Sequence, residues 1–252
     1  MDKKIKKYLK DIEEKFDITI LLACETGSRA WGFPSPDSDY DVRLIYKHKK
    51  DWYLSLAEEK DTIELMLDDN EIDISGWDIR KTLRLLWKSN PPLLERIQSP
   101  IIYTCDNSFL LEMNSIAHHV YSRISTIHHY LSMSKNCFSE IDQKESFKLK
   151  KLFYALRTAI ACKWILEKDE IPPISFPKML DGLKFTNGIK EKIFELIEIK
   201  AQKDESYYHS GDKDLIILIE EMIADADIRA KHLPPGKGNF ETLNDFFKKV
   251  IN

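Results

Sequence analysis

Residues 27–41 read GSRAWGFPSPDSDYD, and this stretch decides how the first half of the chain is organised. It follows the apolar run ITILLAC at residues 18–24, which is typical of a buried strand, so Gly27 and Ser28 lie at the turn that leaves this strand. The prolines and serines of residues 34–38 are typical of a loop. The β-branched and aromatic run YDVRLIY at residues 40–46 then predicts a second strand.

Three aspartates are candidates for one acidic site. Asp39 and Asp41 are two residues apart at the start of the second strand, so their side chains share a face of it. Two adjacent carboxylates repel each other at neutral pH, because each has an ordinary pKa of about 4, unless a cation lies between them. Asp73 is flanked by Ile72 and Ile74, which can face a core while the carboxylate points the opposite way. Three carboxylates can hold two Mg²⁺ or Mn²⁺ ions, which prefer oxygen ligands.

The Gly27-Ser28 turn is a candidate phosphate site beside those carboxylates. Glycine lets the backbone approach a phosphate closely, the free N–H groups at a helix start attract anions, and Ser28 adds a hydroxyl donor. A triphosphate held there would present its α-phosphorus to metals on Asp39 and Asp41, an arrangement suited to phosphoryl transfer. Arg29 is either a phosphate contact or part of the helix surface. Arg43 shares the carboxylate face, where it pairs with Asp41 or contacts phosphate.

The motifs together resemble a known superfamily. A Gly-Ser pair, an Asp-x-Asp about a dozen residues later and a single Asp on a following strand are similar to the DNA polymerase beta-like nucleotidyltransferases. Within that superfamily, GSRAWGFPSPDSDYDVR, IDISGWD and KSNPP resemble the YcgL-like group, which includes proteins named for a polymerase-beta role in RNA repair. The resemblance extends over most of the chain. It implies an α+β fold, in which a polymerase-beta-like palm with a small mixed sheet and flanking helices precedes an all-helical C-terminal domain that closes the nucleotide cleft.

Composition limits the class of protein. The 252 residues carry a net charge of -4, which argues against a protein that binds nucleic acid over its whole surface. The four cysteines are scattered without a Cys-x-x-Cys pair, a pattern that suits reduced thiols in a cytoplasmic protein. No apolar run approaches the roughly 20 residues that cross a membrane, and the basic start lacks the apolar core of a signal peptide. We therefore expect a cytoplasmic protein without a membrane partner.

Strand patterns end near residue 105, so we expect a catalytic domain at residues 1–105 and a helical domain at 106–252. In the first domain, apolar spacing predicts a helix over residues 3–15, and Asp78 is placed to cap a helix that ends near Ser89. The remaining expected elements are a hairpin of strands at 62–67 and 72–75, a short helix ending near 98, a strand at 101–103, and helices at 144–168, 187–201, 215–231 and 240–250.

Two basic segments are candidates for nucleotide or RNA contacts. Lys150, Tyr154 and Arg157 follow one another at i, i+4 and i+7, so they share a helix face that can hold a triphosphate and stack a base, or that simply forms the basic edge of an amphipathic helix. Residues 80–96 carry five cations and one glutamate, a pattern that fits either a solvated helix face or contact with a polynucleotide backbone. Two His pairs, at 118–119 and 128–129, are too far apart along a helix to share one metal.

The residues and the resemblance together predict a metal-dependent nucleotidyltransferase. Asp39 and Asp41 are expected to ligate both Mg²⁺ (or Mn²⁺) ions, and Asp73 the catalytic one, while Gly27 and Ser28 bind the nucleoside triphosphate. The resemblance favours an RNA end, or another polynucleotide end, as the acceptor. Two alternatives remain at this point: an enzyme that nucleotidylates a protein or small molecule, and a nucleotide-binding module without catalysis.

Overall fold

The protein is described by a computed structural model that covers residues 1–69, 71–236 and 238–252. Asn70, in the predicted turn of the hairpin, and Lys237, in the predicted loop before the last helix, lie outside the described residues. The internal contacts divide the chain into two compact units. Unit 1 contains Met1–Ala30, Asp39–Tyr121 and Lys237–Asn252, and unit 2 contains Trp31–Ser38 and Ser122–Gly236.

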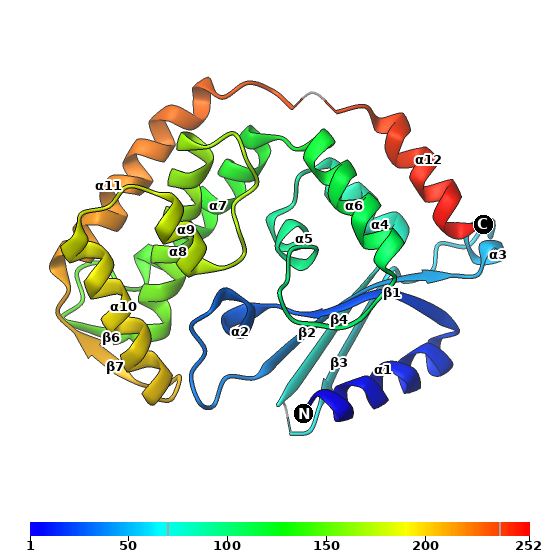
Figure 1. Ribbon diagram of the computed structural model, residues 1–252, viewed down its shortest axis with the longest axis horizontal. Coiled ribbons are helices and arrows are strands. Elements are labelled where there is room, and N and C mark those ends of the chain that lie inside the picture. Colours follow the sequence, from blue (N-terminus) through cyan, green and yellow to red (C-terminus); the bar gives the residue numbers. More distant parts are fainter. Residues whose placement is uncertain (70, 237) are drawn as a thin grey trace. The chain divides into compact units, whose positions relative to one another are not determined.

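Unit 1 is built on a mixed five-stranded sheet with the order β3-β4-β2-β1-β5 (Figure 1). The pair β2 and β4 is parallel, whereas β1 pairs antiparallel with both β2 and β5, and β3 pairs antiparallel with β4. The predicted α+β class with a small mixed sheet is thus confirmed. The strands are β1 (Ile18–Glu25), β2 (Tyr40–His48), β3 (Thr62–Leu67), β4 (Ile72–Asp78) and β5 (Ile102–Cys105).

The helix α1 (Asp2–Phe16) covers one face of this sheet. Its apolar residues Ile5, Leu9 and Ile12 are buried and belong to one core cluster with alternate residues of the strands, among them Ile72 and Ile74. Side chains alternate along a strand, so Asp73 projects from the opposite face, as its sequence context predicts. The remaining helices of unit 1 are α2 (Gly27–Trp31), α3 (Lys50–Tyr53), α4 (Ile79–Trp87), α5 (Pro91–Arg96), α6 (Asn107–Val120) and α12 (Phe240–Ile251).

Asp78 caps α4, as the sequence predicts. Its Oδ1 accepts a hydrogen bond from the Arg80 backbone N–H at 2.7 Å, and its Oδ2 accepts one from the Tyr53 hydroxyl at 2.6 Å. The carboxylate is fully buried, and this burial raises its pKa above the ordinary value of 3.8, against the opposing effect of the two hydrogen bonds. The cap therefore joins the end of β4 to α3 through a buried acid.

This buried acid makes the stability of the protein depend on pH. A carboxyl whose pKa is raised on folding holds its proton more tightly in the folded state, so its contribution to stability is complete below pH 3.8 and is lost as the pH rises through the raised pKa. Asp78→Asn keeps a capping side chain but cannot titrate. We expect the free energy of unfolding, measured in urea from about pH 4 to neutral pH, to fall less with pH in Asp78→Asn than in the wild type. Parallel curves for the two proteins would contradict this prediction.

Unit 2 is helical apart from one small sheet. Its central helix α8 (Leu149–Glu167) contributes more residues to the core of this unit than any other element does. The predicted all-helical domain thus differs from the structure at β6 (Ser146–Lys148) and β7 (Tyr208–Ser210), which form an antiparallel pair that three-residue segments do not reveal by pattern. The other elements are α7 (Arg123–Ser139), α9 (Phe176–Gly182), α10 (Asn187–Gln202), α11 (Lys213–Arg229) and η1 (Ala230–His232).

The two units do not correspond to the two halves predicted at residue 105. Helix α6 packs with β1, α4 and α12. Unit 1 therefore extends to Tyr121 and also includes the C-terminal helix α12. The segment Trp31–Ser38, which lies between the two halves of the first motif, belongs instead to unit 2. Contacts between residues far apart in sequence cause both differences. In the described ranges, none of the helices combines the length and the apolar character needed to cross a bilayer.

Candidate active site

Asp41 and Asp73 lie side by side on adjacent strands of the sheet. They are register partners on the parallel strands β2 and β4. One nitrogen of Arg43, Nη2, donates to Asp41 Oδ1 at 2.6 Å and to Asp73 Oδ2 at 2.8 Å. The side chains of Arg43, Asp41 and Asp73 are 18%, 24% and 31% exposed, so all three remain accessible to a ligand. The structure therefore brings together two of the three predicted carboxylates around a shared cation.

Gly27 lies directly against the Asp41 carboxylate. Its φ of +62° is in the left-handed region, and a Cβ at this position would lie 1.8 Å from Asp41 Oδ2. The turn is fixed to β2 by the backbone, because the Thr26 N–H donates to the Asp41 carbonyl at 2.9 Å. A glycine is therefore required here both for the backbone conformation and for the approach of the carboxylate.

Glu25 is a buried acid of this site that sequence analysis did not select. It is fully buried at the end of β1, and its Oε1 accepts a hydrogen bond from the Asp41 backbone N–H at 2.7 Å. The Tyr103 hydroxyl donates to Oε2. Burial raises the pKa of Glu25 above its ordinary range, whereas the hydrogen bonds from Tyr103 and Asp41 lower it. The sequence signal was a glutamate that closes the apolar run ITILLAC, a position that requires a buried partner.

The other predicted residues of this site flank the carboxylate pair. Asp39 directly precedes β2, and its carbonyl accepts a hydrogen bond from Arg29 Nε at 3.1 Å. The Arg29 guanidinium also lies over the Tyr40 ring, 3.9 Å from its centroid, so it supports the backbone that carries Asp39 and Asp41. Ser28 is buried in α2, which is a single helical turn. No hydrogen bond or ion pair joins the Asp39 carboxylate to another described residue.

The metal-binding capacity of the site rests on oxygen donors. Within the described ranges, no three His, Cys, Asp or Glu side chains are gathered closely enough to form a metal site in the present conformation. In that conformation the Arg43 guanidinium supplies the positive charge next to Asp41 and Asp73. Two carboxylates that already share one cation have the donor chemistry that Mg²⁺ and Mn²⁺ prefer. The oxygen donors of Asp41 and Asp73 therefore fit a divalent ion in their chemistry.

Lys150, Tyr154 and Arg157 lie on one face of α8, where they contact the segment Trp31–Ser38 and its neighbours. The Arg157 guanidinium is buried and lies over the Trp31 ring, 3.8 Å from its centroid. Tyr154 packs edge-on against the same ring, with centroids 5.4 Å apart. Lys150 forms an ion pair with Glu205. The predicted common face exists, and a tryptophan from the first motif covers part of it.

Polar contacts fix the rest of the Trp31–Ser38 segment within unit 2. Glu205 Oε1 accepts a hydrogen bond from the Ser38 hydroxyl at 3.0 Å, and the Glu205 backbone N–H donates to the Asp37 carboxylate. The buried Lys200 donates to the Ser35 hydroxyl at 2.8 Å. Phe33 stacks on Phe153 of α8, with centroids 4.8 Å apart. Asp37, which the sequence indicates as a loop residue, thus anchors that loop.

A family model and a relative agree with the motifs. The model of the family described as "RlaP: RNA repair pathway DNA polymerase beta family" matches residues 1–249. The chain is 41% identical over 205 residues to "Uncharacterized protein YcgL" of Bacillus subtilis (strain 168), covering 81% of this chain and 78% of that protein. A solved structure, "nucleotidyltransferase-like protein from Exiguobacterium sibiricum 255-15", aligns with 98% of this chain and 79% of that one, at 12% identity and a TM-score of 0.28.

Proposed function

Because the chain belongs to the RNA repair pathway DNA polymerase beta family, we propose that it is a metal-dependent nucleotidyltransferase with an RNA end as acceptor. In this reaction an acceptor hydroxyl oxygen forms a bond to the α-phosphorus of a nucleoside triphosphate, the bond to pyrophosphate breaks, and the hydroxyl proton passes to a base. The observation that carries the proposal is the pairing of Asp41 with Asp73 beside the Gly27 turn.

The carboxylates are proposed to hold Mg²⁺ or Mn²⁺. Asp39 and Asp41 would ligate both ions, and Asp73 would ligate the catalytic one and accept the acceptor's proton. When bound, the ions polarise the α-phosphate and lower the pKa of the attacking hydroxyl. Glu25 holds the Asp41 backbone through its N–H, so we assign it a positioning role. Arg43 supplies the countercharge that Asp41 and Asp73 need without metal.

The role of Arg43 can be measured without an activity assay. Arg43→Gln leaves Asp41 and Asp73 without their shared cation, so we expect the metal-free variant to lose about 1–2 kcal/mol of stability. Added Mn²⁺ should then raise its melting temperature more than that of the wild type, because binding to the folded state stabilises it. Arg229→Gln is a matched control, since Arg229 pairs with the exposed Asp225 of unit 2. If Mn²⁺ raises the melting temperature of all three proteins equally, the proposed metal site at Asp41 and Asp73 is rejected.

The triphosphate is proposed to bind at Gly27, Ser28 and Arg29. Glycine permits close approach of phosphate to the backbone, and the serine hydroxyl and guanidinium are donors for phosphate oxygens. For Lys150, Tyr154 and Arg157, direct nucleotide contact stays a prediction. Their contacts with Trp31 and Glu205 support a positioning role, in which they fix the segment that connects Ser28 to Asp39 along the chain.

The proposal is tested by offering each nucleoside triphosphate, labelled at the α-phosphate, with Mg²⁺ or Mn²⁺ and either single-stranded or hairpin RNA. We expect labelled, extended RNA on a denaturing gel. Label on protein or on a small molecule instead would support the nucleotidylation alternative, and nucleotide binding without product would support a silent module. We also place the protein in the cytoplasm, a proposal supported by its four free cysteines.

A further inference from the structure

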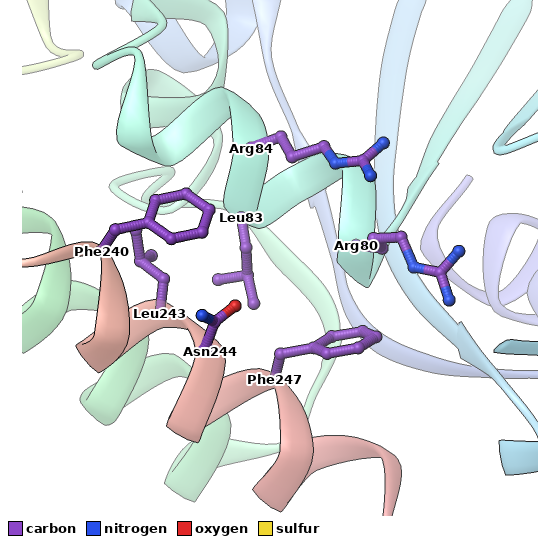
Figure 2. Close-up of a pocket in the computed structure, with 7 residues that line it drawn as sticks. All are labelled: Arg80, Leu83, Arg84, Phe240, Leu243, Asn244 and Phe247. Atoms are coloured by element: carbon purple, nitrogen blue, oxygen red, sulfur yellow. The ribbon is translucent and has the colours of Figure 1, made fainter. Parts of the chain in front are cut away.

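A cavity of about 250 Å³ lies between α4 and α12 of unit 1 (Figure 2). Helix α4 contributes Arg80 and Arg84, and α12 contributes Phe240 and Phe247. Asn244 and two leucines complete the lining. Figure 2 shows both arginine side chains extending from α4 toward the side away from Phe240, with the Phe247 ring near Arg80. The cavity thus combines cations with aromatic rings, and the site built on Asp41 uses none of these residues.

The two arginines place positive charge at the cavity. No carboxylate lines it, and neither arginine forms an ion pair with any residue in the described ranges. Arg80 donates one hydrogen bond to the Tyr53 carbonyl at 2.9 Å and lies 5.6 Å from the Phe247 ring centroid, whereas Arg84 is exposed. Like charges at i and i+4 repel on a helix, so an anion bound to both would be stabilised. Guanidinium groups match phosphate oxygens in geometry and charge.

An exposed aromatic ring, Phe240, lines this cavity, and a second exposed ring, Trp87, packs against it. Phe240 is 44% exposed and Trp87, at the end of α4, is 38% exposed. The two rings pack edge to face, with centroids 5.2 Å apart. Exposed rings beside a positive surface are the features on which single-stranded nucleic acids stack their bases. The ligand that fits both features therefore carries a phosphate and a planar base.

The surroundings narrow the choice of ligand. A neighbouring hollow shares both arginines but is also lined by four acidic residues, which would repel a phosphate on that side. They are Glu58, Glu59, Asp61 and Asp78. The volume of the cavity is below the roughly 300 Å³ at which pockets for complete small ligands begin. A single nucleotide of a longer chain is small enough for this volume. If it enters from the side of Phe240, it also avoids the acidic residues.

We propose that this cavity binds one nucleotide of the single-stranded RNA acceptor, with its phosphate on Arg80 and Arg84 and its base against Phe240 and Trp87. The inference rests on the proposed function for its choice of RNA. The inference also narrows the earlier hypothesis that residues 80–96 as a whole contact a polynucleotide.

In that segment, Arg96 is buried over the Trp77 ring and Lys81 pairs with Asp61. Among the described residues, Arg84 is therefore the arginine of this segment that is exposed and not held by an ion pair.

The experiment measures the binding of a fluorescent single-stranded RNA of roughly 10 nucleotides by anisotropy, without divalent ions. Arg84→Ala should weaken binding at least about fivefold and lower the slope of log K against log salt by about one. Phe240→Ala should weaken binding about 5- to 100-fold without changing that slope. Lys10→Ala, which removes an exposed cation from α1, is the matched control and should bind like the wild type. Circular dichroism confirms that each variant is folded.

Three results would overturn the inference. The wild type could fail to bind RNA, or the Arg84→Ala and Phe240→Ala variants could bind RNA as tightly as Lys10→Ala does. In the third case, AMP would bind this cavity more tightly than RNA does. The last result would make it a mononucleotide site. The proposed function and the cavity proposal can fail independently of each other. If RNA binding depends on Arg84 and Phe240 but no triphosphate is incorporated into any acceptor, only the catalytic proposal is lost. If RNA is extended but the Arg84→Ala and Phe240→Ala variants bind it normally, only the proposal for the cavity is lost.

Discussion

Asp41→Asn is expected to reduce nucleotidyl transfer by at least about a thousandfold, because Asp41 is the proposed ligand of both metals and such a ligand is worth several kcal/mol of transition-state charge stabilisation. The substitution keeps the size of the side chain and removes its charge. Asp41 is partly exposed and Arg43 keeps its bond to Asp73, so the fold should persist with a loss of about 1 kcal/mol or less. The measurement is kcat/KM for RNA extension, together with urea unfolding of the same preparation.

Asp69→Asn is the matched control for this prediction. Asp69 is exposed in the turn between β3 and β4 and has a φ of +52°, a conformation that asparagine tolerates. Its activity should equal that of the wild type. If Asp41→Asn also transfers nucleotides at the wild-type rate, the carboxylate has no part in the reaction and the assignment of this site is wrong.

Gly27→Ala is expected to lower kcat/KM about a hundredfold or more. A Cβ would lie 1.8 Å from Asp41 Oδ2 and 2.8 Å from its Cγ, so either the turn or the carboxylate must move. Misplacing a reacting group by about 1 Å commonly reduces the rate about a hundredfold. The left-handed φ of +62° adds a strain of about 1–2 kcal/mol in an alanine, so the melting temperature should fall as well.

Gly188→Ala separates this effect from the general consequence of replacing glycine. Gly188 lies in α10, and a Cβ there would meet nothing within 4 Å. Alanine favours a helix over glycine, so this variant should keep full activity and gain up to about 1 kcal/mol of stability. Full activity in Gly27→Ala would mean that the reaction does not need Asp41 in its present place.

Local patterns predicted most of unit 1. The spacing of Ile5, Leu9 and Ile12 identified α1, and the isoleucines around Asp73 correctly placed this carboxylate on the face opposite the core. The hairpin of β3 and β4 followed from two apolar runs with a polar turn. Each of these elements depends on residues that are close in sequence, and there side-chain period and capping are reliable guides.

Long-range contacts were the part that patterns did not reveal. Sequence alternation suggested that Arg43 pairs with Asp41 or phosphate, but the second bond to Asp73 depends on the parallel register of β2 and β4. Glu25 gains its role only when Asp41 and Tyr103 are folded against it. Likewise, the periodicity of α8 identified the face of Arg157 without indicating that Trp31 would pack on it.

The division of unit 1 into three stretches of chain has a practical consequence for dissecting the gene. No single cut yields unit 1 alone, because truncation after Tyr121 removes α12 and strips the Trp31–Ser38 segment of its partners. Phe33, which is 1% exposed in the whole protein, would then face water, and an N-terminal fragment should aggregate when expressed alone. A shortened protein would have to retain both ends of the chain, replace Ser122–Gly236 by a short linker and carry a polar residue in place of Phe33.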